Sequence, residues 1–305
     1  MRQSAIWPLL AKATHMRYVQ GYLMIRIIHT LGGCGGTILS RCIGVLPGIA
    51  LFSEINPASI RRFSYLDPLY QDRNWIHLLE AAELERFSEL DLEKAEAFRE
   101  VIAALHVRAV ETGRHLVLRD FNLVDFVGIP FCASPPQKLT LYAALPAAIP
   151  TRSVAFIRHP MDQWSSICKH EEVRDLTPST FCNAYAAFLH ELGDIPIHRY
   201  EDFVERPKSC LQAICEDLLL PFDPVFIDRF QSFDYVTGDF SRHQEKSISA
   251  PAKRSLPPQA LEEFRACGTF KLILSATGYE ELGTPGPLQK RANAGGTDSS
   301  SLGLA

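Results

Sequence analysis

The residues best suited to chemistry near the start of the chain form a glycine-rich loop. Residues 32–36 read GGCGG, follow an apolar run at 24–29, and are followed by Thr37. Glycines let backbone N–H groups turn toward an anion, a following helix adds partial positive charge at its N-terminus, and Thr37 adds a hydroxyl. The loop lacks the lysine of G-x-x-x-x-G-K-[ST], so it is not a Walker A motif. We expect it to bind a phosphate-like group; a plain tight turn is the alternative.

A second candidate anion site follows an apolar run at 153–157. Arg158 comes directly after this run, Pro160 is placed to begin a helix, and Ser166 lies eight residues beyond Arg158. An arginine offers a planar fork of donors to a phosphate, and a serine adds a hydroxyl donor. The alternative for Arg158 is a structural ion pair.

Five short apolar runs must position these side chains. They read as strands at 24–29, 49–52, 116–118, 153–157 and 195–200. Helical patterns separate them, and the clearest covers 91–110 with an apolar face. Alternating strands and helices predict an α/β fold with a mostly parallel sheet, in which ligands bind at the carboxyl ends of the strands. Both candidate anion sites fall at such ends.

Composition excludes several classes of protein. The 305 residues carry 31 Lys plus Arg against 35 Asp plus Glu, so the net charge is −4, which disfavours a general nucleic-acid binder. The chain is 47% hydrophobic, as globular proteins are. Eight cysteines without a C-x-x-C pair predict free thiols in a reducing, cytoplasmic compartment, and the apolar runs are too short to predict a membrane span. Residues 1–282 are expected to form one domain and 283–305 a disordered tail.

Together the two anion motifs resemble those of sulfotransferases that use 3′-phosphoadenosine 5′-phosphosulfate (PAPS). The matching segments are LGGCGGTILSR at 31–41 and FIRHPMDQWSS at 156–166, supported by HRYEDFVERP at 198–207 and TGDFSR at 237–242. The site layout is most similar to that of tyrosylprotein-type members. The resemblance implies a three-layer α/β fold of the P-loop NTPase-like sulfotransferase type, with a mostly parallel central sheet flanked by helices. Loops 55–90 and 238–256 would then serve the acceptor and the cofactor.

The resemblance also implies which residues hold the donor. The 5′-phosphosulfate would be held by Gly33, Cys34, Gly35, Gly36 and Thr37. Arg158 and Ser166 would hold the 3′-phosphate, and Tyr200 would lie near the adenosine. One of Arg242, Lys253 and Arg254 would close over the phosphates from the late loop.

One position departs from the family pattern. Many members carry Lys or Arg where this chain has Gly33, and that cation stabilises the charge on the transferring group. Arg119, after the third predicted strand, is the best substitute, and Arg41 is the second candidate. If neither reaches the sulfate, the protein binds PAPS without turning it over.

Sulfuryl transfer to an alcohol also requires a base that removes the acceptor proton. Glu54, which follows the second predicted strand, is the candidate, and tyrosylprotein-type members are similar in carrying a glutamate there. The alternative for Glu54 is a turn glutamate paired with Arg61 or Arg62. His29 is a weaker candidate for the base.

The sequence therefore predicts a sulfotransferase that moves a sulfuryl group from PAPS to a hydroxyl or amine and releases adenosine 3′,5′-bisphosphate (PAP). The acceptor is a small molecule, a carbohydrate or a peptide, and no metal is required. A nucleotide-dependent phosphotransferase and a non-catalytic nucleotide-binding protein are the alternatives. Oligomeric state is left open.

Overall fold

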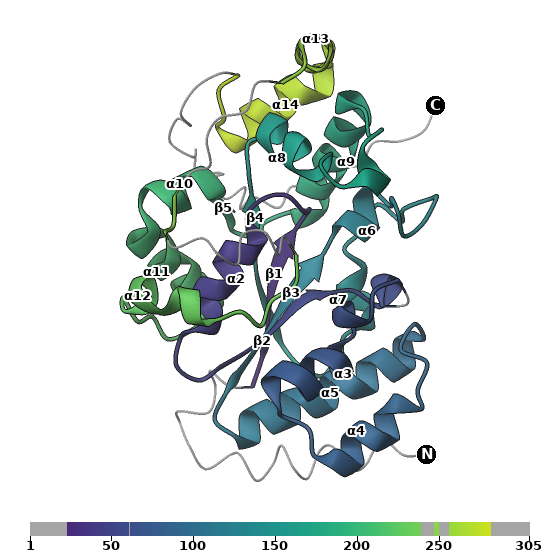
Figure 1. The fold of residues 1–305 in the computed structure, drawn as a ribbon, viewed down its shortest axis with the longest axis vertical. Coiled ribbons are helices and arrows are strands. Elements are labelled where there is room, and N and C mark those ends of the chain that lie inside the picture. The colour runs from purple at the N-terminus through teal and green to yellow at the C-terminus, as the bar shows by residue number, and fades with distance from the viewer. Residues whose placement is uncertain (1–22, 61, 239–246, 250–255, 282–305) are drawn as a thin grey trace, which may run out of the picture.

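One parallel sheet of five strands forms the centre of the molecule (Figure 1). The computed structural model describes residues 23–60, 62–238, 247–249 and 256–281. The strands are β1 (Ile25–Thr30), β2 (Ile49–Ile55), β3 (His115–Phe121), β4 (Thr151–Ile157) and β5 (Ile197–Arg199). Their order is β2–β3–β1–β4–β5, so the glycine-rich loop that follows β1 leaves the middle of the sheet.

Helices connect the strands and cover both faces of the sheet (Figure 1). Those before β4 are α2 (Gly36–Gly44), α3 (Pro68–Gln71), the π-helical turn Asp72–Ile76, α4 (Ala81–Ser88), α5 (Ala95–Glu111), α6 (Leu123–Phe126) and α7 (Thr140–Ala144). Those after β4 are α8 (Pro160–Ile167), α9 (Pro178–Leu192), α10 (Tyr200–Glu205), α11 (Pro207–Leu218), α12 (Phe226–Arg229), α13 (Pro258–Ala266) and α14 (Gly268–Thr277). Short 3-10 turns occupy Pro57–Ser59, Ser64–Leu66, Glu171–Val173 and Phe230–Ser232.

The sheet is apolar on both faces because alternate strand residues point to opposite sides. Ile28 and Val117 pack with α2 and α11 on one face, whereas Ile27 and Leu118 pack with α5 on the other. A third apolar cluster joins Ile157 to α8, α9 and α14 beyond the carboxyl end of β4. Packed helices therefore surround the strand ends that carry the polar residues: α2 and α11 on one face of the sheet, α5 on the other, and α8, α9 and α14 beyond β4.

The predicted fold is confirmed, with corrections to the element boundaries. β2 extends past the predicted 49–52 as far as Ile55, so Glu54 lies inside the strand and not after it. β3 extends to Phe121 and likewise includes Arg119. The helix predicted over 91–110 begins at Ala95, because Lys94 has an extended backbone.

Some predictions fall on residues outside the part of the chain that the structure describes. They concern the late-loop cations Arg242, Lys253 and Arg254, most of the 238–256 loop, and the tail at 283–305. Within the described residues, no helix combines the length and the apolar character needed to cross a membrane.

Candidate active site

The loop between β1 and α2 has a backbone that requires glycine. Gly33 and Gly35 have φ of +64° and +90°, in the left-handed region that L side chains rarely adopt. A Cβ on Gly33 would lie 2.8 Å from Cγ1 of Ile167 and 2.9 Å from the backbone oxygen of Gln163. A Cβ on Gly35 would collide with the Tyr200 ring. The cationic side chain of the family pattern therefore has no room at position 33.

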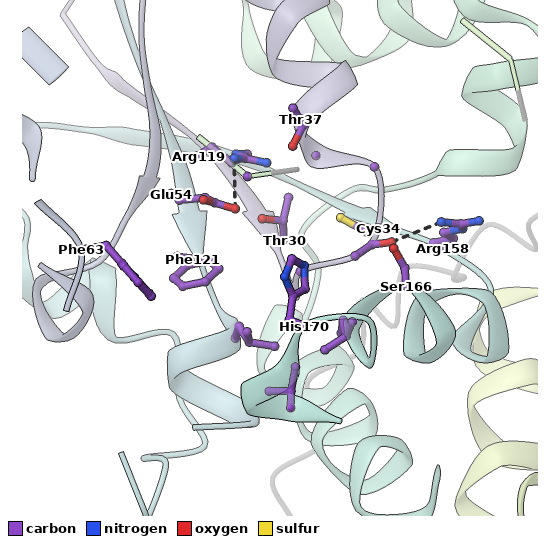
Figure 2. A pocket seen from close by; sticks show the side chains of 18 of the residues that line it. Thr30, Cys34, Thr37, Glu54, Phe63, Arg119, Phe121, Arg158, Ser166 and His170 are labelled. Atoms are coloured by element: carbon purple, nitrogen blue, oxygen red, sulfur yellow. Dashed lines mark hydrogen bonds and ion pairs between the residues drawn. The ribbon is translucent and has the colours of Figure 1, made fainter. Parts of the chain in front are cut away.

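A cavity of about 200 Å³ opens beside this loop (Figure 2). Nine of the predicted site residues line it, and they are Gly33, Cys34, Gly35, Gly36, Thr37, Glu54, Arg119, Arg158 and Ser166. They come from the ends of β1, β2, β3 and β4, from the start of α2 and from α8. The structure thus brings together, at one edge of the sheet, residues separated by more than a hundred positions in the chain.

Arg119 places a buried positive charge under the glycine-rich loop. Its side chain is 3% exposed, and Nη2 donates to Ser53 Oγ at 2.7 Å and to the Thr237 carbonyl oxygen at 2.9 Å. Its Nη1 lies 2.6 Å from the position that a Gly36 Cβ would occupy, so glycine allows this close approach. Nε is buried and has no hydrogen-bond partner among the described residues. Because Arg119 also lines the cavity, its guanidinium is placed to contact a bound anion.

Arg41, the other candidate for the missing loop cation, points away from the cavity. Its Nε donates to the Phe233 carbonyl oxygen at 3.1 Å, and Nη2 donates to that of Gln231 at 3.1 Å. An ion pair of 3.4 Å links Nη2 to Asp234. Since Arg41 is committed to the segment after α12 and does not line the cavity, the geometry favours Arg119.

Glu54 is aimed into the cavity by an irregularity in β2. The register with β3 shifts between Phe52 and Ile55, and Glu54 has φ of +58°, a strained value for a residue with a side chain. Such strain persists only where neighbouring groups hold it, and it is typical of functional sites. Its carboxylate lies 3.2 Å from Arg119 Nη2 (Figure 2). Arg62, a suggested partner, pairs with Glu172 at 3.6 Å, and Arg61 lies outside the described residues.

Arg158 lies across the loop from Arg119 (Figure 2). Its guanidinium carbon stacks 4.8 Å from the centre of the Tyr200 ring, and Nη1 donates to the Gly33 carbonyl oxygen at 3.4 Å. The backbone oxygen of Arg158 accepts a hydrogen bond from the Tyr185 hydroxyl at 2.9 Å, which fixes the end of β4. Nε of Arg158 is buried without a partner among the described residues, as Nε of Arg119 is.

Tyr200 lies next to the glycine-rich loop and Arg158. It is 2% exposed and lies beneath Gly35 and Arg158, and it does not line the cavity. Its ring supports the loop and the arginine. The expected contact with an adenosine stays a prediction.

His29 is part of a buried network that links β1 to β3. Its Nδ1 lies 3.0 Å from Asp120 Oδ2, and its Nε2 lies 3.0 Å from the Tyr142 hydroxyl. Hydrogen bonds extend the network from Asp120 through Asn122 to Asp125. Burial, followed by the charge of Asp120, raises the pKa of Asp125 to about 7. Because His29 is fully buried and does not line the cavity, it is poorly placed to act as the base.

Sequence reasoning missed several residues that line the cavity. Phe121, Pro130, Phe131 and His170 all form part of its wall. Gly238 also lines it, since Thr237 and Gly238 cross over Thr37. The available signals were weak: Phe121 follows a predicted strand end by a few residues, and His170 stands out chiefly as a possible metal ligand. The described residues contain no cluster of His, Cys, Asp and Glu side chains suited to a metal ion.

Of the comparisons with known proteins, the one with solved structures found similar chains. No family model matches the chain, and no curated protein matches it. Among solved structures, it is similar to the sulfotransferase domain of the Synechococcus PCC 7002 olefin synthase, with a TM-score of 0.51 and 17% identity over 79% of this chain and 94% of that domain. It is also similar to the sulfotransferase domain from the curacin biosynthetic pathway, with a TM-score of 0.46 and 18% identity over 84% and 98%. The first similarity shows that this chain has the fold of a sulfotransferase domain.

Proposed function

We propose that this protein is a sulfotransferase that moves a sulfuryl group from PAPS to the hydroxyl or amine of an acceptor. The observation that carries the proposal is the Glu54–Arg119 pair, which faces the glycine-rich loop in a cavity that Arg158 also lines. A carboxylate, a buried cation and a set of backbone N–H groups are the parts that proton removal and charge stabilisation require. The sulfotransferase fold adds support by analogy of architecture.

The residues present fit a donor with two phosphate-like groups. The loop offers backbone N–H groups at the N-terminus of α2, where a Cβ on Gly33 or Gly35 would clash with neighbouring atoms. Arg119 and Arg158 each keep a buried Nε without a partner among the described residues, and buried donors left unpaired are costly. Both arginines line the cavity, one on each side of the loop, so each is placed to pair with an anion, and PAPS has one at its 5′ end and another at its 3′ end.

PAPS supplies the sulfuryl group, so that a bond from acceptor oxygen to sulfur forms as the bond from sulfur to the 5′-phosphate oxygen breaks and PAP leaves. Glu54 accepts the proton that the acceptor hydroxyl gives up. Arg119 and the N–H groups of the loop offset the negative charge that collects on the phosphate side. Arg158 and Ser166 hold the 3′ end and keep the donor in register.

Two alternatives have less support. A phosphotransferase of the Walker A type needs a loop lysine, and the sequence supplies none. A non-catalytic nucleotide-binding protein was suggested by Gly33, but Arg119 places a cation beside the loop by another route.

The eight cysteines, all free thiols, support a cytoplasmic setting.

Calorimetric titration with PAP tests the binding part of this proposal. We expect PAP to bind more tightly than ATP, and Arg158→Ala to weaken PAP binding by about tenfold or more, because a charge-assisted hydrogen bond is lost. Arg152→Ala is the matched control, since Arg152 is exposed at the amino end of the same strand. Tight ATP binding without PAP binding would contradict the proposal.

A further inference from the structure

Six residues of the cavity wall form an apolar extension that the donor-binding residues do not explain. We call it the aromatic arm, and it consists of Phe63, Tyr65, Phe121, Leu123, Pro130 and Phe131. Two of them come from the long segment between β2 and α3, Phe121 ends β3, and the other three follow β3. The arm therefore joins two segments that the sheet brings together at the same edge.

The rings of the arm contact one another in a continuous series. Phe63 stacks on Tyr65 with ring centres 5.3 Å apart and meets Phe131 edge-on at 6.1 Å. Phe131 in turn meets Phe121 edge-on at 5.3 Å. Such edge-to-face geometry stabilises aromatic pairs beyond the area that they bury, so the wall is preorganised to receive another ring.

The arm leads to the carboxylate that we assign as the base. Figure 2 shows Glu54, Phe63 and Phe121 on one side of the cavity, and Arg158 and Ser166 on the other side of the loop. A molecule held in the arm thus has Glu54 at its inner end and the donor site beyond. This is the order that in-line transfer needs.

The charges beside the arm are already paired with one another. Glu54 and Glu172 line the cavity near these rings, and Glu54 pairs with Arg119 and Glu172 with Arg62, so these two arginines are not free to bind an anion held in the arm. Burial, followed by the charges of Glu54 and Glu172, raises the pKa of Tyr65, so its hydroxyl stays neutral. Most of the wall also lacks groups that could satisfy the many hydroxyls of a sugar, which are costly to bury unpaired.

We propose that the aromatic arm is the acceptor subsite and that it takes an uncharged aromatic hydroxyl compound, with Phe63 and Phe121 determining specificity. The inference rests on the proposed function for the chemistry, because Glu54 must receive the proton of that hydroxyl. The subsite itself is a matter of binding and can be measured without turnover.

The test compares two probes that share a ring and a phenolic hydroxyl and differ in charge. Calorimetry with 4-hydroxybenzamide and with 4-hydroxybenzoate, each with and without PAP, should show about tenfold tighter binding of the neutral amide. Methyl glucoside, the sugar probe, should bind more weakly than the amide. Tighter binding of the benzoate or of the glucoside would overturn the proposal.

Variants test whether 4-hydroxybenzamide binds in the aromatic arm. Phe63→Ala should weaken binding of 4-hydroxybenzamide by about tenfold, because the aromatic contact is lost. Tyr70→Ala is the matched control, since Tyr70 lies in α3 directly after that segment, is 38% exposed and does not line the cavity. Equal affinity in wild type and Phe63→Ala would contradict the proposal, and equal losses in both variants would do so too.

Experiment can distinguish a wrong acceptor subsite from a wrong function. If the aromatic arm is not the acceptor subsite, the wild type still binds PAP and that binding still depends on Arg158. Failure of the proposed function appears as absent PAP binding, while 4-hydroxybenzamide still binds and still depends on Phe63.

Discussion

Glu54 and Arg119 are two nearly buried charges held 3.2 Å apart at the end of neighbouring strands. Burying a charge costs free energy unless partners offset it, and a buried ion pair is weak evidence for stability. Arg119 donates hydrogen bonds to Ser53 and Thr237, but its Nε stays unpaired among the described residues. A strained carboxylate beside an incompletely satisfied cation fits a site that awaits a ligand better than one built for stability.

Arg119→Ala should reduce turnover much more than PAP affinity. The cation acts on charge that develops during transfer, so we expect a loss of about 100-fold or more in kcat. Arg41→Ala is the matched control because Arg41 is equally buried and lies on α2, yet it contacts the 231–234 segment. Steady-state kinetics and PAP titration on both variants, after thermal melting to check folding, measure the difference. Similar kinetics for the two variants would remove Arg119 from the proposed mechanism.

At the scale of elements, the backbone next to Glu54 is held by hydrogen bonds from a side chain of another segment. Gln71 of α3 is fully buried, and its side-chain amide donates to the Ser53 carbonyl oxygen at 2.7 Å and accepts from the Ser53 N–H at 2.7 Å. The same amide nitrogen donates to the Tyr65 carbonyl oxygen at 2.9 Å. One side chain thus holds both the irregular end of β2 and a segment of the aromatic arm.

Gln71→Ala should remove these hydrogen bonds and lower kcat by about tenfold or more. The reason is that a small displacement of the Glu54 carboxylate from its working position slows the transfer step. PAP affinity should stay the same, since the glycine-rich loop belongs to β1 and α2. Asn74→Ala is the control, because Asn74 lies three residues on and bonds only to the Tyr70 carbonyl oxygen among the contacts described. Kinetics that split kcat from the KM for PAPS measure the effect. A fall in PAP affinity that matches the fall in kcat would indicate a general structural role for Gln71.

Elements and site residues differ in how far the sequence predicts them. The strands were predictable because they are short β-branched runs, and Arg158 and Arg119 because polar residues at strand ends face one edge of the sheet. The bend at Glu54 was not predictable, since it depends on Gln71, which lies 17 positions further along the chain. The aromatic arm has the same origin: its rings meet through tertiary packing, and no periodicity marks them.

At the scale of the whole molecule, a buried polar network that does not line the cavity joins the carboxyl ends of β1 and β3 to the segment after β3. Asp120 contacts His29 on β1, and Asn122 links Asp120 to Asp125 after β3. Burial and the nearby charge of Asp120 raise the pKa of Asp125 to about 7, although hydrogen bonds from Thr140 and Asn122 oppose this. The network therefore couples folding to protons in the neutral range.

The sign of this coupling follows from linkage. A carboxyl with a raised pKa in the folded state binds more protons when folded, so its contribution to stability is present below about pH 4 and is lost as pH rises through about 7. Asp125→Asn removes that loss, and the variant should gain stability relative to wild type between pH 5 and pH 8, by at most about 1.4 kcal/mol per pH unit. Urea denaturation at both pH values measures the difference. Since burial lowers the pKa of His159 and of His198, which gives the opposite slope, the comparison of variant with wild type is the relevant quantity. Parallel pH profiles would contradict the assignment.

The most direct test of the central claim follows labelled sulfate from PAPS to a pool of hydroxyl acceptors with wild type and Glu54→Gln. The amide keeps the size of the side chain and cannot accept the proton, so we predict that wild type transfers the label and that the variant does so at least about 100-fold more slowly, with equal PAP affinity. Transfer by Glu54→Gln at the wild-type rate, or binding of PAP by wild type with no transfer to any acceptor, would contradict the account.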